Sequence, residues 1–315
     1  MTDTLALDDH TAMVVDRLRA LVAGIAGPAG GLLSPLLRDP GKCLRSLLLG
    51  AAARCGVHDT ERTVRLGAVV ELLHLASLVH DDVIDDAGTR RGGPAVHVVA
   101  GRELAVLAGL ACLALAGTEA AELGPDVDRA VSRTAAELAL GEMLDVQRAF
   151  DAALPLEDYR LVVERKTGAL FGLCCALGAA SGGLSGERVR ALAGFGRDLG
   201  VAFQILDDCL DLAPVAGGKP VGTDHLLGLF GAPTLFALRS DPSGALAALL
   251  LAPSFSAADL PEVRRLVNAA GGVDAARDWC RAVHRDAVAR LDVLDDGPAR
   301  DALVRVAGLT LRTTP

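Results

Sequence analysis

The sequence predicts an all-α protein that folds as a single domain over residues 1–315. Segments rich in Ala, Leu and Val recur at helical spacing along the whole chain, without the strict alternation of a β-strand. No run of Gly, Pro or Ser is long enough to form a linker between domains. Hydrophobic residues make up 51% of the chain, which is enough for one large core.

We expect long helices over residues 60–87, 127–150, 156–180 and 187–212, followed by a shorter helical tail after Pro261. Turn signals separate these segments, namely Gly124-Pro125, Leu154-Pro155 and Ser181-Gly182-Gly183. The first and the last of the long helices each end on an acidic motif, so the helix ends are where chemistry is expected.

Composition excludes several classes of function. A net charge of -9 argues against nucleic-acid binding, which needs a basic face. The N-terminus lacks the positive region of a signal peptide, and no uninterrupted apolar run reaches the ~18 residues of a membrane span. We therefore expect a cytoplasmic protein without a transmembrane segment. The seven cysteines form no CxxC pair, so neither disulfides nor zinc are expected.

Two acidic motifs match each other, Asp81-Asp82-Val83-Ile84-Asp85 and Asp207-Asp208-Cys209-Leu210-Asp211. On a helix the first and last Asp of each motif share a face, where like charges repel by a few tenths of a kcal/mol per pair. One copy alone could be a helix cap or a solvated face, but both copies follow strongly apolar runs. Carboxylates without His or Cys suit Mg²⁺, which leaves coordination positions for phosphate oxygens. The motifs therefore predict a diphosphate substrate.

Basic residues are distributed unevenly. Of 31 Lys and Arg residues only three are lysines, Lys42, Lys166 and Lys219, and each has glycine within two residues. Small neighbours allow backbone and charge to approach a phosphate closely, although any one of the three alone could be a surface lysine. His74 precedes Asp81 by two helical turns, and the pair Arg90-Arg91 follows the first motif. A lone His on an apolar face is usually a core residue, but the adjoining charges favour a role facing the ligand.

Seven motifs in order resemble those of the trans-isoprenyl diphosphate synthases, over about residues 38–240. They are Gly41-Lys42-Cys43-Leu44-Arg45, Glu71-Leu72-Leu73-His74 with the first Asp motif, Thr89-Arg90-Arg91-Gly92, Gly141-Glu142-Met143-Leu144, Lys166-Thr167-Gly168, Phe203-Gln204 with the second Asp motif, and Gly218-Lys219-Pro220-Val221-Gly222. The resemblance implies an isoprenoid synthase fold, which is a helical bundle around a central elongation cavity. It also implies a homodimer, with the two Asp motifs facing each other across the cavity mouth.

The resemblance also implies the reaction and the role of each residue. An allylic diphosphate would ionise, and the double bond of isopentenyl diphosphate would attack the carbocation before a proton is lost. About three Mg²⁺ ions would be held by Asp81, Asp82, Asp85, Asp207, Asp208 and Asp211. The leaving diphosphate would be bound by Arg90, Lys166, Thr167, Gln204 and Lys219. The diphosphate of isopentenyl diphosphate would be bound by Lys42, Arg45, His74 and Arg91.

Product length is predicted to exceed the fifteen carbons of farnesyl diphosphate. Small residues, Ala76 and Ser77, occupy the positions five and four before Asp81, where bulky aromatics close the cavity floor in short-chain members of the family. Leu72 and Leu73 lie further back on the same helix and are candidates for a deeper floor. The expected product is therefore geranylgeranyl diphosphate or a longer polyprenyl diphosphate.

The chain departs from the family pattern in three places. Cys43 and Ser46 stand where many members have Arg and Pro, which weakens the expected positive field at the isopentenyl site. Gly109-Leu110 replaces the usual Gly-Asp, and residues 223–228 lack the basic residues common after the second motif.

Two other functions are compatible with parts of the pattern. A class I terpene cyclase shares the fold and the first Asp motif, but cyclases generally carry an Asn/Ser/Glu triad in place of the second one. Cyclases also line their cavity with aromatics, which are only 3% of this chain. A non-catalytic subunit of a heteromeric prenyl synthase typically loses Asp ligands or lysines, and this chain keeps them.

Overall fold

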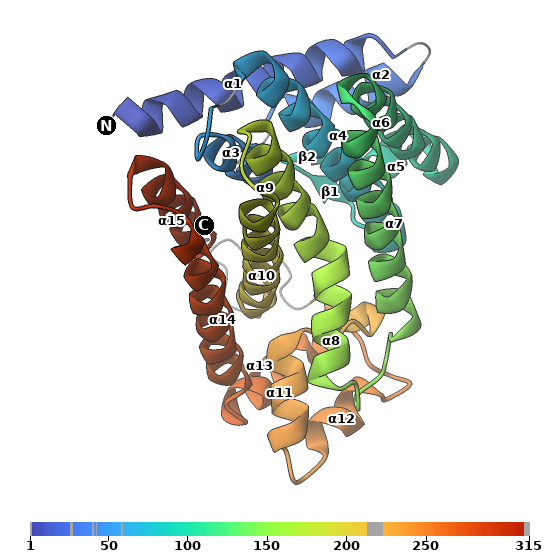
Figure 1. Cartoon of the computed structure of the whole chain (residues 1–315). Helices are drawn as coiled ribbons and strands as arrows, with labels where there is room; N and C mark the ends of the chain where they lie inside the picture. The colour runs from blue at the N-terminus through green and yellow to red at the C-terminus, as the bar shows by residue number, and fades with distance from the viewer. Residues whose placement is uncertain are drawn as a thin grey trace. The chain divides into compact units, whose positions relative to one another are not determined.

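The computed structural model describes residues 2–25, 28–39, 41, 43–57, 59–212 and 223–311. This part of the chain is helical apart from one short hairpin (Figure 1), so the predicted all-α class is confirmed. The chain divides into two compact units. Unit 1 comprises Met1–Leu138, Leu170–Gly196 and Arg290–Val306, and unit 2 comprises Ala139–Ala169, Arg197–Ala289 and Ala307–Pro315. The single domain stays a prediction.

Unit 1 is built around α4, which packs against α1, α3 and α6. Its elements are α1 (Thr2–Ala23), α2 (Pro28–Leu33), η1 (Ser34–Leu37), α3 (Leu44–Ala53), α4 (Thr60–Ile84), β1 (Thr89–Arg90), β2 (Gly93–Pro94), α5 (Val96–Ala100), α6 (Arg102–Leu123) and η5 (Arg290–Val293). Four further helices have residues in both units: α7 (Pro125–Gln147), α9 (Ala169–Ser181), α10 (Gly186–Asp211) and α15 (Pro298–Thr310).

Helix α4 carries the first Asp motif at its C-terminal end. It begins after Asp59, whose side chain accepts a hydrogen bond from the Arg62 amide at 3.2 Å and caps the first turn. It ends at Ile84, three residues before the predicted end, because Asp86 adopts a left-handed φ of 53°. The helix is buried along most of its length, which explains why its sequence is apolar on nearly every face.

A two-residue hairpin follows α4 and presents two of the predicted cationic residues. Thr89 pairs with Pro94 and Arg90 pairs with Gly93 in antiparallel register. The two turn residues, Arg91 and Gly92, have φ values of 51° and 74°. Positive φ at both central positions is the type I′ geometry of tight hairpins, and glycine at the second one favours it. Sequence periodicity did not predict this hairpin, because its strands are too short to show alternation.

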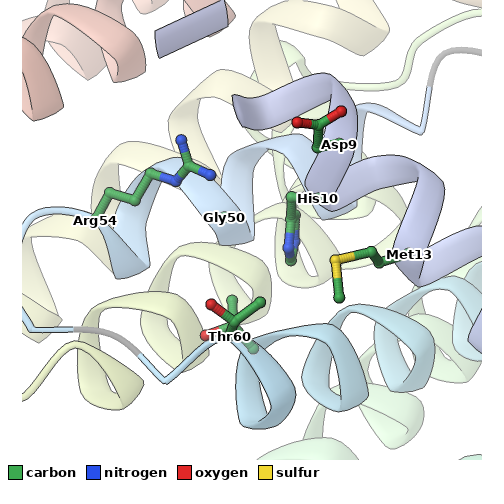
Figure 2. A pocket seen from close by; sticks show the side chains of 7 residues that line it. Asp9, His10, Met13, Gly50, Arg54 and Thr60 are labelled. Atoms are coloured by element: carbon green, nitrogen blue, oxygen red, sulfur yellow. The ribbon is translucent and has the colours of Figure 1, made fainter. Parts of the chain in front are cut away.

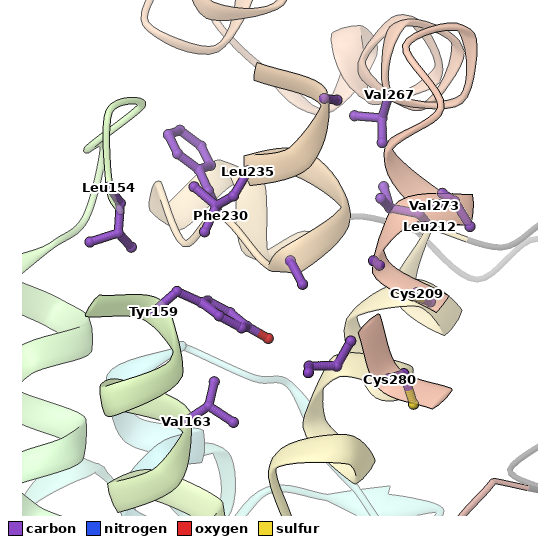
Figure 3. Packing of buried hydrophobic residues seen from close by; sticks show 14 of the residues in the cluster. Leu154, Tyr159, Val163, Cys209, Leu212, Phe230, Leu235, Val267, Val273 and Cys280 are labelled. Atoms are coloured by element: carbon purple, nitrogen blue, oxygen red, sulfur yellow. The ribbon is translucent and has the colours of Figure 1, made fainter. Parts of the chain in front are cut away.

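Unit 2 surrounds the apolar cluster shown in Figure 3, in which α11 packs on α13 and α14. The elements that lie wholly in unit 2 are α8 (Leu156–Val163), η2 (Glu164–Gly168), η3 (Thr223–Leu227), α11 (Ala232–Ser240), α12 (Ala245–Leu250), η4 (Ala257–Asp259), α13 (Leu260–Ala269) and α14 (Gly272–Ala289). The cluster buries Tyr159, the chain's only tyrosine, together with residues of α10 and α11.

The helix predicted over residues 156–180 is interrupted by the π-helical turn η2. The turn widens the helix at Lys166 and Thr167, and π-turns are frequent at functional sites. Gly168 ends the turn and lies against Gly200 of α10. A Cβ on Gly200 would lie 2.7 Å from the Gly168 Cα, so a larger residue at position 200 would clash with the end of the turn.

Two helices of the described chain, α4 and α6, are long and apolar enough on length and composition alone to cross a membrane. The apolar window of α4 is 72% buried, as in a core helix, whereas that of α6 is only 39% buried. The seven cysteines are free thiols in this structure, and all but Cys55 are buried.

Candidate functional site

The first Asp motif differs in environment between its members. Asp82 is buried, with a side-chain exposure of 1%, and its Oδ1 accepts hydrogen bonds from Arg90 Nε at 2.8 Å and Arg90 Nη2 at 2.5 Å. Asp81, in the last turn of α4, and Asp85, its C-cap, are four residues apart and are both partly exposed. The middle carboxylate is therefore held by the hairpin, and the outer two share a face that solvent can reach.

A buried cluster of charged residues lies in unit 1 beside this motif. Burial and the neighbouring guanidinium groups of Arg45, Arg91 and Arg90 lower the pKa of His74 well below its ordinary value. His74 is therefore neutral near pH 7. Arg45 lies over the Phe171 ring at 5.1 Å from the centroid, and Arg91 Nη1 donates to the Leu36 carbonyl at 2.8 Å. The structure thus brings together the three described residues predicted for the isopentenyl site, Arg45, His74 and Arg91.

The second Asp motif, in unit 2, has the same division between its members. Asp207 is exposed and Asp211 partly so, whereas both oxygens of Asp208 accept hydrogen bonds from protein groups. The Tyr159 hydroxyl donates to Asp208 Oδ2 at 2.5 Å and the Ala232 amide donates to the same oxygen at 2.9 Å. Gln204 Nε2 donates to Oδ1 at 3.1 Å. Desolvation raises the pKa of Asp208 to about 7, although each of these hydrogen bonds lowers it.

Asp208 also holds the start of α11 against α10. The Ala232 amide that it binds is the first N–H of α11, a position that has no partner within the helix. A Cβ on the preceding Gly231 would lie 2.6 Å from Asp208 Oδ2, so only glycine allows this approach. Tyr159 was not predicted as a site residue. A signal for it was present in the composition, because it is the only tyrosine in the chain, just as the three lysines are rare among the basic residues.

Lys166, Thr167 and Gln204, which were predicted to bind the leaving diphosphate, all lie in unit 2. Thr167 Oγ1 donates to Gln204 Oε1 at 3.0 Å, which continues the chain of hydrogen bonds that reaches Asp208. Lys166 Nζ lies 2.9 Å from both Glu142 Oε2 and Asp145 Oδ2. These two acids were not predicted as site residues, although Glu142 lies in a quoted motif. An incoming diphosphate would compete with them for the ammonium group.

The four residues predicted to set chain length lie together on α4. Leu72, Leu73 and Ala76 are almost completely buried, and Ser77 is partly exposed, with its hydroxyl bonded to the His74 carbonyl at 2.9 Å. The predicted residues Lys42 and Lys219 lie outside the described residues.

The departures from the family pattern have local structural reasons. Gly109 gives room to His80, because a Cβ there would lie 2.3 Å from His80 Nε2, and Leu110 is 55% exposed. In the segment 223–228, His225 is buried and its Nε2 lies 2.7 Å from Thr234 Oγ1. The His225 imidazole is thus hydrogen-bonded to another residue of unit 2.

The donors available for a metal are carboxylate oxygens. Among the described residues no three Asp, Glu, His or Cys side chains already converge in a metal-binding arrangement. The outer carboxylates, which are partly or fully exposed and spaced four residues apart at the C-terminal ends of α4 and α10, fit a hard divalent cation that takes its remaining ligands from phosphate and water.

A pocket of about 210 Å³ lies elsewhere in unit 1 (Figure 2). It is lined by Asp9, His10, Met13, Gly50, Arg54, Thr60 and Thr63. None of these residues was predicted to act in catalysis. Gly50 makes space for the His10 ring, because a Cβ there would lie 2.6 Å from His10 Cδ2.

Comparison with known proteins decides the family. A model of the polyprenyl synthetase family matches residues 31–267. The chain belongs to this family. It is 37% identical over 281 residues to the nonaprenyl diphosphate synthase of Mycobacterium tuberculosis, covering 88% of this chain and 84% of that protein. It is 34% identical over 299 residues to heptaprenyl diphosphate synthase component 2 of Geobacillus stearothermophilus, covering 94% and 92%.

Solved structures of family members share the fold. The polyprenyl synthase of Caulobacter crescentus CB15, crystallised with calcium and isoprenyl diphosphate, has a TM-score of 0.92 at 30% identity and covers 98% of this chain and 96% of that one. The predicted isoprenoid synthase fold is therefore confirmed. The second DDxxD motif, Asp207–Asp211, which the terpene cyclases generally lack, is intact in the sequence.

Proposed function

We propose that the protein condenses an allylic diphosphate with isopentenyl diphosphate, head to tail and in trans, to give a chain longer than farnesyl diphosphate. The observation that carries the proposal is the family match together with two intact Asp motifs whose outer carboxylates are accessible. Relatives named as nonaprenyl, heptaprenyl and geranylgeranyl diphosphate synthases support a long product.

The test is a turnover assay on the purified chain alone. Radiolabelled isopentenyl diphosphate is supplied with Mg²⁺ and one of several allylic primers, and the product is resolved by chromatography after dephosphorylation. Incorporation that requires both a primer and Mg²⁺ supports the proposal. Absence of incorporation with every primer would refute it for the chain acting alone.

The metal ions of this proposal are Mg²⁺, about three in number. All six aspartates of the two motifs would hold them: Asp81, Asp82, Asp85, Asp207, Asp208 and Asp211. The calcium in the Caulobacter crescentus structure supports a divalent metal in the family. Bound metal would neutralise the charge that develops on the leaving diphosphate as the carbon–oxygen bond breaks.

The chain's own residues would bind and orient the two substrates. Lys166, Thr167 and Gln204, with Arg90 and Lys219, would hold the allylic diphosphate, and an ammonium at Lys166 would stabilise it as it leaves. Arg45, His74, Arg91 and Lys42 would hold isopentenyl diphosphate. The proton lost at the end would go to the departed diphosphate.

His74 is expected to act as a neutral hydrogen-bonding group, because burial and three arginines lower its pKa. The Michaelis constant for isopentenyl diphosphate should therefore show no step due to His74 between pH 6 and 8. His74→Gln keeps a neutral polar group and should remain within about threefold of wild type, whereas His74→Ala should raise that constant by about two- to tenfold. A step near pH 6.5 that disappears in His74→Gln would contradict this expectation.

The length of the product is expected to depend on Ala76, which is 1% exposed on α4. Ala76→Phe would place a ring in the elongation channel and shift the products toward shorter chains, while Mg²⁺ dependence stays the same. Ala76→Ser adds little volume and is the matched control, with products like those of wild type. An unchanged distribution in Ala76→Phe would show that this residue does not line the channel.

A homodimer is part of this proposal, with α5 and α6 supplying its interface. Their exposed apolar residues are Val98, Val99, Leu104, Val106, Leu107 and Leu110. Several exposed apolar side chains on two helices that pack together favour an interaction surface, and a twofold dimer buries the same surface on both subunits.

The predicted cytoplasmic location is also part of the proposal. It is supported by the similarity in fold to solved structures of the family along 98% of the chain.

Leu107→Glu is expected to convert the dimer to a monomer, because it places a charge within the proposed interface. Val57→Glu is the control, since Val57 is 93% exposed and far along the chain from α6. Light scattering coupled to size-exclusion chromatography measures the mass. A wild type with the mass of one chain would exclude the homodimer.

A second possibility is that the chain needs a partner subunit, because two relatives are named as component 2 of a heptaprenyl diphosphate synthase. Turnover by the chain alone decides against that requirement. An inactive chain that gains activity when a second component is added would establish it.

A further inference from the structure

Helix α3 begins in an unusual way. Its N-cap, Cys43, has a left-handed φ of 42°, and its side chain does not cap the backbone N–H groups of the first turn. A non-glycine residue in this conformation costs energy, so surrounding contacts must hold it. Ser46, the third residue of the helix, donates its hydroxyl back to the Cys43 carbonyl at 2.9 Å. The usual helix cap is therefore replaced by contacts from elsewhere.

Glu71 of α4 supplies the missing cap. Its Oε1 accepts a hydrogen bond from the Ser46 amide at 3.2 Å, across 25 residues of sequence. This amide is one of the first-turn N–H groups that lack a partner within a helix. Glu71 is only 5% exposed, and a buried carboxylate without compensating contacts would be costly. The bond thus satisfies both groups and ties the start of α3 to α4.

Glu71 is also the carboxylate that balances the buried cations of the isopentenyl site. Burial lowers the pKa of Arg45 and Glu71 raises it, while burial raises the pKa of Glu71 and Arg45 lowers it. Arg91 acts on both groups. Cys43 adds no charge, because burial raises its pKa to about 11. Glu71 thus acts on both cations, and a bound diphosphate would add negative charge beside them.

We propose that Glu71 is a positioning residue for isopentenyl diphosphate: it holds the first turn of α3, and with it Arg45, in the geometry that binds the diphosphate. The proposal rests on the proposed function. It also accounts for Ser46, because proline, which many family members have there, has no N–H to donate to Glu71. Glu71 acts through Arg45 and does not touch the reacting atoms.

Steady-state kinetics with each substrate varied in turn test this role. Glu71→Ala is expected to raise the Michaelis constant for isopentenyl diphosphate by about tenfold or more. The constant for the allylic primer and the turnover number at saturation should change less than about twofold. Glu71→Gln keeps an oxygen that accepts the Ser46 N–H and should stay within about threefold of wild type.

Glu119→Ala is the matched control for general destabilisation. Glu119 is also 5% exposed in unit 1 and is paired with Arg17 and Arg65, so its loss removes a buried carboxylate away from the site. It should lower the melting temperature and leave both Michaelis constants unchanged. If Glu71→Ala changes the constants for both substrates equally, or neither of them, the role is excluded.

A double-mutant cycle assigns the effect to the bond itself. Ser46→Pro removes the donor, so Glu71→Ala should raise the Michaelis constant for isopentenyl diphosphate less in the Ser46→Pro background than in wild type. Fully additive effects would overturn the capping role. Failure of wild type to use isopentenyl diphosphate would instead refute the proposed function, and the two failures are thus distinguishable.

Discussion

Replacing Asp81 or Asp207 by alanine is expected to lower turnover by about a thousandfold at saturating Mg²⁺. Each change removes an outer carboxylate that is accessible at the end of a long helix. Losing one ligand from a clamp between metal and diphosphate removes several kcal/mol of transition-state stabilisation. Incorporation of radiolabelled isopentenyl diphosphate, measured over a Mg²⁺ titration, gives the effect.

Two controls separate metal binding from folding. Asp126→Ala removes a carboxylate that is 95% exposed at the start of α7 and should leave turnover unchanged. Asp208→Ala should in addition lower the melting temperature by several degrees, because it leaves the Tyr159, Gln204 and Ala232 donors without their acceptor. If Asp81→Ala or Asp207→Ala retains more than a tenth of wild-type turnover, the aspartate that was replaced is not a metal ligand.

Replacing Lys166 by alanine should weaken use of the allylic substrate by about 10- to 100-fold. The variant loses a charge-assisted contact to the leaving diphosphate, worth ~1.5 to 3 kcal/mol. Lys42→Ala should instead raise the Michaelis constant for isopentenyl diphosphate. The role of Lys42 is predicted from its sequence motif alone. Kinetics with one substrate varied at a time separate the two effects.

The carboxylates around Lys166 provide its control. Glu142→Gln removes one of the two acids paired with the ammonium group and leaves Lys166 in place, so it should not weaken binding of the allylic substrate. If Lys166→Ala and Lys42→Ala have the same effect on both substrates, the assignment of separate diphosphate sites is wrong.

Local patterns predicted much of the architecture. The long helices ending in the Asp motifs were predicted to within three residues at either end, because apolar periodicity and turn residues act over short distances. The π-turn over residues 164–168 was not predicted, because its local sequence remains compatible with a continuous helix. The turn ends at Gly168, which lies against Gly200, and these two residues are 32 positions apart in sequence.

The sequence by itself determined the helical class, the family motifs and the identity of the acidic and basic residues, because these depend on residue type and spacing along the chain. Only the tertiary structure decided what each side chain contacts. It distinguished Asp82 and Asp208 from their neighbours, and it brought Tyr159 to Asp208 and Glu71 to the start of α3. Such pairs form between helices far apart in sequence, where burial makes an unsatisfied polar group costly, and no local pattern records which partner satisfies it.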